Sequence, residues 1–237
     1  MRTPYKILST RKFPTEILSK YEGRNVLITS ENFISTNVIK DEPTVSKINE
    51  LATGEHSVVF TSANAVTAVA SALADTVSLK WKIFCIGHAT LAAVKAAFGE
   101  QLLAGTANDA ALLAAVIAEG KQPEEILFFC GTSRRNELID GLLKSNIIVN
   151  ELHVYETIAV EKEVNESYDA ILFFSPSGVR SFFQLNAIAK EVKLFAIGQT
   201  TATELKLFTN NTVLTAPSPD AIALLEQTIA HFSPVNI

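Results

Sequence analysis

Short apolar runs along the chain stop at small polar residues, and each is followed by a segment with helical spacing. The clearest case is the apolar run 171–174, which ends at the turn 175–178 and continues as a helix from Val179. Apolar runs of this length predict buried strands, and the serines after them predict helix N-caps. Because such strands and helices alternate throughout the chain, the pattern predicts parallel sheets with helices on both faces.

This alternation is repeated within the chain. Three pairs of segments match: 58–66 with 171–179, 82–90 with 193–201 and, more weakly, 16–28 with 137–149. The members of each pair are separated by roughly 110–120 positions, as in a duplicated strand-turn-helix unit. The chain therefore predicts two copies of one unit.

Two extended, charged stretches, at 40–43 and 159–163, interrupt the repeats and are predicted to be linkers. Each follows the second strand of its copy, so the simplest compact arrangement joins the first two strands of one copy to the last three of the other. We therefore expect an α/β protein with two similar flavodoxin-like domains, residues 1–40 plus 160–237 and residues 43–157. Each domain is expected to hold a parallel five-stranded sheet with helices on both faces; the domains are segment-swapped and joined by a two-stranded linker.

The composition fits a globular protein and limits the classes of partner. Of the 237 residues, 48% are hydrophobic, and no apolar run approaches the roughly 20 residues that span a bilayer. The N-terminal segment has no apolar core long enough for a signal peptide, so we expect a cytoplasmic protein. The net charge of −5 argues against a nucleic-acid partner. Cys85 and Cys130 lie inside apolar runs and are expected to be reduced core thiols.

In open parallel sheets, ligands bind outside the carboxyl ends of the strands, so the turns after the predicted strands form the candidate site. These turns lie at 10–11, 61–64, 87–90, 131–135, 175–178 and 198–201. The arginines in or just after them are Arg11, Arg134, Arg135 and Arg180. Their charge favours a polyanionic ligand. The plainer interpretation assigns each turn only to helix capping and each arginine to solvent.

The motifs that mark cofactor or metal chemistry are absent from the sequence. It contains no GxGxxG, no P-loop and no His-Glu metal pair, and no serine or cysteine nucleophile is recognisable. We therefore expect neither a cofactor nor a metal. His88 is the only one of the four histidines inside a candidate turn. Tyr155 stands where a strand runs out into the return linker, where it either overhangs the cleft or is a half-buried interface tyrosine.

Several short segments, considered together, carry a family resemblance. They are Phe60-Thr61-Ser62 followed by Asn64-Ala65-Val66, Ile86-Gly87 with Thr90, Val154-Tyr155-Glu156-Thr157, Phe174-Ser175-Pro176-Ser177-Gly178-Val179 and Ala196-Ile197-Gly198-Gln199-Thr200-Thr201-Ala202. In this order and spacing they cover most of the chain and resemble the uroporphyrinogen-III synthase family.

The resemblance implies cyclisation of the linear tetrapyrrole hydroxymethylbilane, with loss of water and inversion of the last pyrrole ring (ring D) through a spiro intermediate, to give uroporphyrinogen III. No cofactor is implied. Tyr155 matches the family's tyrosine whose role is nearest to a general acid, and Thr201 is the second catalytic candidate. The substrate-binding candidates are Arg11, Thr61, Ser62, Asn64, Thr90, Ser175, Ser177, Gly178 and Thr200.

The expected partner is the tetrapyrrole itself, with a transient handover from hydroxymethylbilane synthase. The chain is expected to act as a monomer, without a membrane or nucleic acid. Two other functions fit the residues: a two-domain protein that closes on a small acidic ligand without chemistry, and a sugar-phosphate enzyme that uses the same turns for phosphate.

Overall fold

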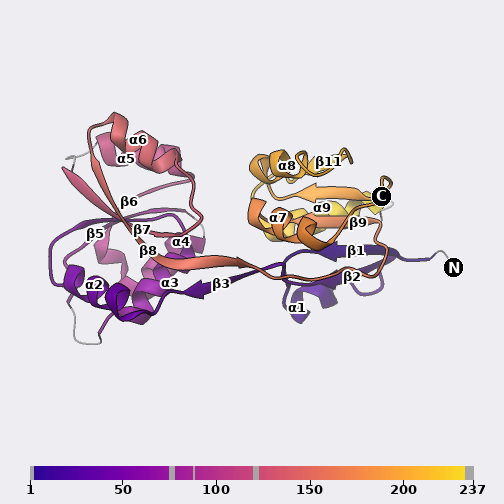
Figure 1. The fold of residues 1–237 in the computed structure, drawn as a ribbon, viewed down its shortest axis with the longest axis horizontal. Coiled ribbons are helices and arrows are strands. Elements are labelled where there is room, and N and C mark those ends of the chain that lie inside the picture. Colours follow the sequence, from indigo (N-terminus) through magenta and orange to yellow (C-terminus); the bar gives the residue numbers. More distant parts are fainter. Residues whose placement is uncertain (1–2, 75–77, 88, 120–122, 233–237) are drawn as a thin grey trace. The chain divides into compact units, whose positions relative to one another are not determined.

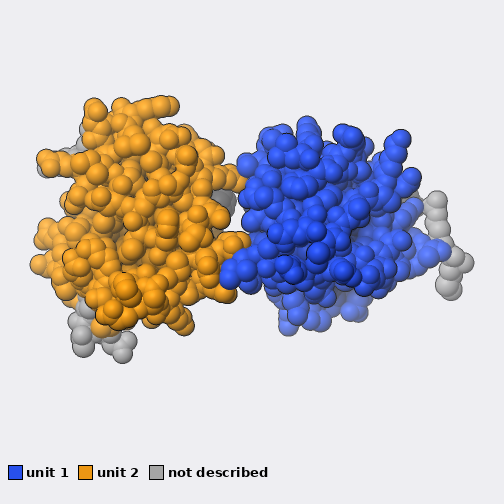
Figure 2. Space-filling model, viewed as in Figure 1, with its two compact units in different colours: residues 1–35, 158–237 blue, residues 36–157 orange. Residues whose placement is uncertain are grey.

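The computed structural model describes residues 3–74, 78–87, 89–119 and 123–232. It divides the chain into two compact units, which are coloured separately in Figure 2. Unit 1 consists of residues 1–35 and 158–237, and unit 2 of residues 36–157. The two ends of the chain therefore build one unit and its middle builds the other, so the predicted segment swap is confirmed. That residues 1–40 plus 160–237 and residues 43–157 are the domain boundaries stays a prediction.

Unit 1 contains a parallel sheet of five strands (Figure 1). The strands are β1 (Tyr5–Ser9), β2 (Val26–Ser30), β9 (Ala170–Phe173), β10 (Lys193–Ala196) and β11 (Val213–Thr215). Their order across the sheet is β11-β10-β9-β1-β2, and every pairing is parallel. Counted along unit 1 alone, this order is the flavodoxin-like one that the repeat predicts.

Helices cover both faces of the unit 1 sheet because successive residues of each strand point to opposite sides. Ile171 and Phe173 of β9 pack in the cluster that includes α7 and α8, whereas Ala170 and Leu172 pack in the cluster that includes α9. The helices of unit 1 are α1 (Thr15–Leu18), the short 3₁₀ helix η1 (Ser19–Tyr21), α7 (Pro176–Leu185), α8 (Gln199–Leu205) and α9 (Ala221–Phe232).

The sheet of unit 2 repeats this arrangement from different parts of the chain. Its strands are β3 (Ile34–Val38), β4 (Ser57–Phe60), β5 (Lys82–Ile86), β6 (Leu103–Ala107), β7 (Glu125–Gly131) and β8 (Ile148–Ala159), in the order β3-β8-β7-β4-β5-β6. Strands β7 and β8 take the places that β1 and β2 have in unit 1. The prediction of two flavodoxin-like sheets is therefore confirmed.

The linker strand β3 adds a sixth, antiparallel member to the second sheet. The amide of Ile39 donates to the carbonyl of Val154 at 3.0 Å, and the amide of Val160 donates to the carbonyl of Phe33 at 2.9 Å. Since the partner number falls as the position along β3 rises, the two segments run in opposite directions. The expected two-stranded linker thus pairs as a ladder that continues the sheet.

The core of unit 2 lies on both faces of its sheet. Leu127 and Phe129 of β7 pack in a cluster with residues of α2, α3 and α4, which we call the α2–α4 cluster. Phe128 and Cys130 pack on the opposite face with α5 and α6 (Figure 1). These helices are α2 (Glu42–Ala52), α3 (Ala63–Ala72), α4 (Ala89–Phe98), α5 (Ala110–Glu119) and α6 (Glu137–Lys144), with a 3₁₀ turn η2 (Glu100–Leu102) after α4.

Both cysteines are buried and free, as predicted. Burial raises the pKa of the Cys85 thiol to about 11 and, together with the nearby Glu151 carboxylate, that of Cys130 to about 12. Both are therefore protonated at neutral pH. No helix among the described residues has the length and the apolar character needed to cross a membrane.

Candidate functional site

The carboxyl ends of β1 and β9 lie side by side in unit 1 and bring two predicted turns together. The hydroxyl of Thr10, just after β1, donates to the carbonyl of Leu172 in β9 at 2.8 Å. A Cβ built on Gly178 would lie 4.0 Å from that hydroxyl oxygen and 3.3 Å from Ser175 Oγ. Thr10, Ser175 and Gly178 therefore lie close together at the carboxyl edge of the unit 1 sheet. Thr10 is near the other two because its strand, β1, pairs with β9.

Ser175 is the N-cap of α7. Its Oγ accepts a hydrogen bond from the amide of Gly178 at 3.0 Å and lies 3.1 Å from Ser177 Oγ. The amide of Val179 in turn donates to the carbonyl of Ser175. In the first turn of α7, Pro176 has no amide hydrogen, and the amides of Gly178 and Val179 both donate to Ser175. The amide of Ser177 is therefore the one that is open to a ligand. The partial positive charge of the helix terminus remains available to an anion.

In the turn after β10, no side chain caps the helix that follows, unlike in the turn after β9. Gly198 precedes α8 without a side-chain cap, so the amides of Gln199, Thr200 and Thr201 have no capping side chain. Thr200 is exposed, whereas Thr201 is only 2% exposed, and no group among the described residues hydrogen-bonds its hydroxyl. Thr201 is thus an almost fully buried residue in the first turn of a helix at the carboxyl edge.

In unit 2, β4 ends in the turn that the sequence pairs with 175–178. Ser62 is the N-cap of α3, and its Oγ accepts from the amide of Asn64 at 3.2 Å. Thr61 is half-buried and the Asn64 side chain is exposed. Thr90, in the first turn of α4 after the adjacent strand β5, is 4% exposed. His88 lies outside the described residues.

Two of the four predicted edge arginines are held by carboxylates. Arg180 Nη1 lies 2.9 Å from Glu204 Oε1, which joins α7 to α8. Arg134 binds both carboxylate oxygens of Glu151, with Nη2 at 2.7 Å from Oε1 and Nε on Oε2. Arg11 and Arg135 are exposed, and neither has an ion pair within the part of the chain that the structure describes. The charge open to a ligand is therefore smaller than the arginine count predicts.

Tyr155 lies over the last residue of β7. A Cβ built on Gly131 would be 2.5 Å from Tyr155 Cζ and 3.0 Å from its hydroxyl oxygen. The amide of Thr132 donates to the carbonyl of Tyr155 at 3.1 Å. Tyr155 is half-buried, and no group in the described ranges hydrogen-bonds its hydroxyl. The phenol is therefore placed at the carboxyl edge of the sheet and free to bond a ligand.

A β-bulge sets the direction of the Tyr155 side chain. Cys130 pairs with His153 but Gly131 pairs with Tyr155, so Val154 is an extra residue on β8. Strict alternation would send Tyr155 to the face of Glu151, Cys130 and the α5–α6 helices. Instead, Val154 and Tyr155 both pack in the α2–α4 cluster. Bulges re-aim side chains in this way and are common beside active sites.

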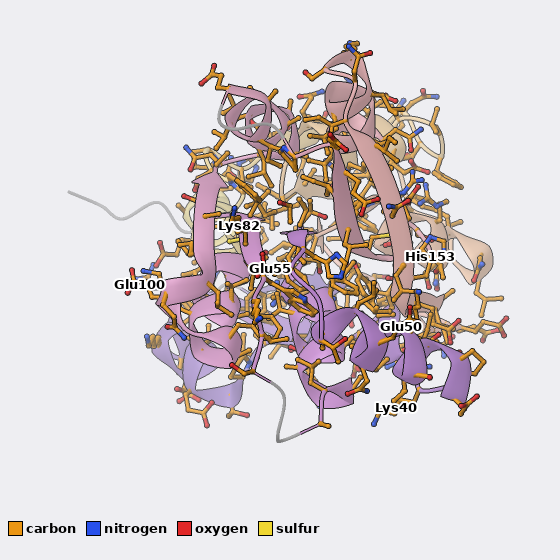
Figure 3. All side chains as sticks on the ribbon, turned by 90° about the vertical axis from the view of Figure 1, so that its left-hand side faces the viewer. Lys40, Glu50, Glu55, Lys82, Glu100 and His153 are labelled. Atoms are coloured by element: carbon orange, nitrogen blue, oxygen red, sulfur yellow. The ribbon has the colours of Figure 1, made fainter. Side chains whose placement is uncertain are left out.

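The opposite face of the same strands carries three potential metal ligands. The donor atoms of Cys130, Glu151 and His153 all lie within 4.8 Å of one another, and His153 is seen on β8 in Figure 3. Hydrogen bonding to Arg134 holds the pKa of Glu151 below its ordinary value, and both carboxylate oxygens are engaged by the guanidinium. Because the thiol is also protonated at neutral pH, this group is not a set of ready metal ligands.

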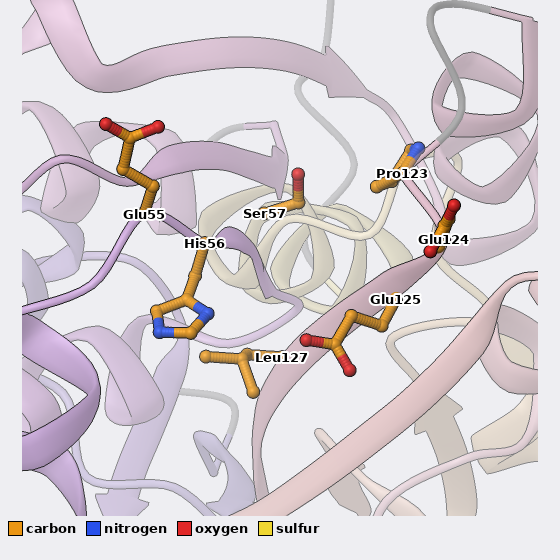
Figure 4. A pocket seen from close by; sticks show the side chains of 7 residues that line it. All are labelled: Glu55, His56, Ser57, Pro123, Glu124, Glu125 and Leu127. Atoms are coloured by element: carbon orange, nitrogen blue, oxygen red, sulfur yellow. The ribbon is translucent and has the colours of Figure 1, made fainter.

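A surface pocket of about 290 Å³ lies at the other ends of the strands (Figure 4). It is lined by Glu55, His56, Ser57, Pro123, Glu124, Glu125 and Leu127, which surround the starts of β4 and β7. Its carboxylates repel an anionic ligand. Within unit 2 the candidate turns therefore lie at the opposite edge of the sheet from this pocket.

The structure places each candidate residue within one of the two units. Arg11, Ser175, Ser177, Gly178, Thr200 and Thr201 belong to unit 1, and Thr61, Ser62, Asn64, Thr90 and Tyr155 to unit 2. Sequence reasoning missed the close approach of Gly131 to the ring of Tyr155. The available signal was a glycine that directly follows the apolar run of β7.

Comparison with known proteins agrees with this fold. The family model described as uroporphyrinogen-III synthase HemD matches residues 23–226. A uroporphyrinogen-III synthetase structure from Helicobacter pylori is similar with a TM-score of 0.66 and 16% identity, covering 96% of this chain and 99% of that one. A mutant uroporphyrinogen III synthase structure from Thermus thermophilus gives 0.65 and 15%, with coverage of 96% and 98%. At these identities the two structures support the fold, and the family model spans most of the sequence. The chain belongs to the uroporphyrinogen-III synthase family, a family of lyases in tetrapyrrole biosynthesis.

Proposed function

We propose that this chain converts hydroxymethylbilane into uroporphyrinogen III, with Tyr155 as the group that assists loss of water. The observation that carries the assignment of Tyr155 is its hydroxyl: it is half-buried at the carboxyl edge of a parallel sheet and has no hydrogen-bond partner among the described residues. A phenol hydroxyl can donate a hydrogen bond to an oxygen. Membership of the family supplies the substrate and reaction.

The substrate is a flexible polycarboxylate, and the edge turns offer many weak contacts for it. Helix N-termini favour anions through their free amides and partial charge. In unit 1 the candidates are Ser175, Ser177 and Gly178 at α7, Thr200 at α8, and the exposed Arg11. In unit 2 they are Thr61, Ser62 and Asn64 at α3 and Thr90 at α4. Such contacts bind carboxylates while the protein keeps a net charge of −5.

In the first chemical step, the pyrrole nitrogen of the ring that carries the hydroxymethyl group, at the opposite end of the substrate from ring D, pushes out the hydroxyl group. The carbon–oxygen bond breaks, and the oxygen leaves as water with a proton from Tyr155. The resulting azafulvene cation is attacked by the ring D carbon that already bears the link to ring C, which gives the spiro intermediate. The bond from this carbon to the linking carbon of ring C then breaks, which leaves a second azafulvene cation on ring C. The free carbon of ring D attacks that cation, and the proton that this carbon loses as ring D becomes aromatic again returns to the tyrosinate, so the residue is regenerated.

Choice of product is a matter of geometry. Attack at the free carbon of ring D would give the type I isomer without a spiro intermediate, so the protein must hold the chain in the fold that favours the substituted carbon. Positioning is therefore the main catalytic contribution. We assign Thr201 to this task beside Tyr155, because it lies in the first turn of α8, which has no side-chain cap, at the carboxyl edge of the unit 1 sheet.

We further propose that the protein acts in the cytoplasm as a monomer and receives its substrate by transient handover from hydroxymethylbilane synthase. Two free, buried cysteines fit a reducing compartment. The substrate closes spontaneously in water, so a short path between the two enzymes would preserve it.

The test supplies hydroxymethylbilane from a coupled hydroxymethylbilane synthase and determines the isomer formed. We expect the type III isomer in proportion to the chain added, whereas the reaction without it gives type I. A product that stays type I at every concentration of the chain would overturn the proposal.

A further inference from the structure

We propose that Gly131 is a positioning residue for the reaction: it leaves the space in which the phenol tip of Tyr155 lies and thereby fixes the direction of the hydroxyl. This inference rests on the proposed role of Tyr155. Gly131 itself touches neither the substrate nor the reacting atoms in this account.

The contact involves the end of the ring that carries the hydroxyl. The nearest atoms to a Cβ built on Gly131 are Cζ at 2.5 Å, Cε2 at 2.6 Å and the hydroxyl oxygen at 3.0 Å. Real Cβ atoms essentially never approach another atom closer than 3.0 Å. Since carbon atoms prefer separations of about 3.5–4.0 Å, a methyl group here would push the phenol tip away by about 1 Å.

The backbone of Gly131 does not itself require glycine. The positive φ angles of the described glycines occur at Gly23 and Gly99, so Gly131 has a conformation open to other residues. The ring of Tyr155 is therefore what a side chain at this position would meet.

Two other features help to position Tyr155. The β-bulge turns Tyr155 toward the α2–α4 cluster, against which its ring packs. The hydrogen bond from the Thr132 amide to the Tyr155 carbonyl fixes the backbone beneath it. The phenol therefore packs against the α2–α4 cluster and also lies close to the bare backbone of Gly131.

Gly141 in α6 provides a matched control. A Cβ there would come within 2.6 Å of the Ala114 Cβ, a contact as tight as that at Gly131, on the α5–α6 side of unit 2. Gly141→Ala should therefore disturb packing without meeting Tyr155.

The experiment measures kcat and KM for formation of the type III isomer in the coupled assay. It compares the wild type with four variants: Gly131→Ala, Gly141→Ala, Tyr155→Phe and the double variant Gly131→Ala/Tyr155→Phe. We expect Gly131→Ala to lower kcat about 10- to 100-fold with a smaller change in KM, since a misplacement of about 1 Å can cost that much. Gly141→Ala should keep the wild-type kcat. In the Tyr155→Phe background, Gly131→Ala should lower kcat less than about 2-fold further, because the two changes remove one function.

Two measurements do not depend on turnover. The ¹⁹F resonance of Tyr155, assigned in fluorotyrosine-labelled protein by its loss in Tyr155→Phe, should move in Gly131→Ala and stay in place in Gly141→Ala. The drop in melting temperature caused by Gly131→Ala should also disappear in a Tyr155→Ala background, where the ring is absent. A wild-type kcat, an unmoved resonance or an unrelieved drop in melting temperature would each overturn the inference about Gly131.

The outcomes separate the two proposals. If Tyr155→Phe turns over like the wild type, the role of Tyr155 fails, and the role of Gly131 in catalysis fails with it. If Tyr155→Phe is impaired but the Gly131→Ala effect is fully multiplicative with it, only the positioning role of Gly131 is overturned.

Discussion

Arg134 binds Glu151 through both carboxylate oxygens, with Nη2 at 2.7 Å from Oε1 and Nε on Oε2. The pair joins the turn after β7 to strand β8, three residues before Val154, the extra residue of the bulge that directs the side chain of Tyr155. Bidentate pairs of this kind fix geometry as well as adding energy. Arg134 therefore supports the edge of the sheet rather than offering a free charge to the substrate.

This ion pair predicts a pH-dependent contribution to stability. Hydrogen bonding to Arg134 holds the pKa of Glu151 below its ordinary value of 4.5. The contribution is therefore present above pH 4.5 and is lost as the pH falls through the lower pKa of the folded state. We expect Glu151→Gln to reduce the free energy of unfolding by about 1 kcal/mol at pH 7 in urea denaturation, and by much less at pH values below the folded-state pKa.

Glu50→Gln is the control for this prediction, because Glu50 pairs with Lys47 on an exposed helix face. It should change stability by less than about 0.5 kcal/mol. A pH-independent loss in Glu151→Gln would contradict the assignment of that stability to the charged pair.

The N-cap of α7 predicts that replacing the neighbouring serines Ser175 and Ser177 will have different effects on stability. Ser175 Oγ accepts a hydrogen bond from the amide of Gly178, whereas the hydroxyl of Ser177 hydrogen-bonds only the Ser175 hydroxyl among the described groups. Ser175→Ala should destabilise unit 1 by about 1 kcal/mol, the usual cost of losing an N-cap, and Ser177→Ala by clearly less. Chemical denaturation of both variants measures this. Equal losses would mean that the cap energy does not come from the Ser175 hydroxyl.

The free charge at the edge predicts unequal effects of two arginines on substrate binding. Arg11 is exposed without an ion pair within the described ranges, whereas Arg180 is held by Glu204 at 2.9 Å. If Arg11 binds a substrate carboxylate, Arg11→Gln should raise KM about 5-fold, equivalent to about 1 kcal/mol, and leave kcat nearly unchanged. Raising the salt concentration should reduce this difference. An equal rise in KM for Arg180→Gln would show that the effect is one of net charge rather than of position.

The swapped layout predicts that the middle of the chain folds by itself. Residues 36–157 form a continuous segment with a core on both faces of its sheet. Expressed alone, this segment should unfold in a single cooperative transition by circular dichroism. The shorter segment 43–157 lacks β3 and tests the predicted boundary, since β3 adds only an edge ladder. Absence of a cooperative transition in both segments would mean that unit 2 needs the rest of the chain.

The architecture could be predicted from the sequence because local hydrophobic patterns indicate its strands and helices and the internal repeat indicates its two similar domains. The apolar runs at 58–60 and 171–174 end at capping serines, and both became central strands followed by helices. The position of the two charged linkers after the second strand of each copy then made the swapped pairing the simplest compact arrangement. The antiparallel ladder of β3 depends on the register between distant segments, which no local pattern contains.

Details of the site could not be predicted, since they arise where strands meet. The bulge at Gly131 decides which face Tyr155 occupies, and the sequence shows no sign of the extra residue. In the same way, Arg134 and Arg180 looked like free charges because their partners, Glu151 and Glu204, are brought to them only by the fold. The residue types in the turns therefore predicted which edge of each sheet carries the candidate site. Contacts between distant parts of the chain determine which side chains at that edge are free to bind a ligand.

The proton donor is the central claim, and Tyr155→Phe tests it most directly. The variant keeps the ring over Gly131 and removes only the hydroxyl. In the coupled assay we expect the rate of type III formation to fall about 100-fold, at the lower end of what a general acid contributes, while the product remains type III because positioning is shared by many contacts. Tyr5→Phe, in β1 of unit 1, should react like the wild type. A wild-type rate in Tyr155→Phe would contradict the account.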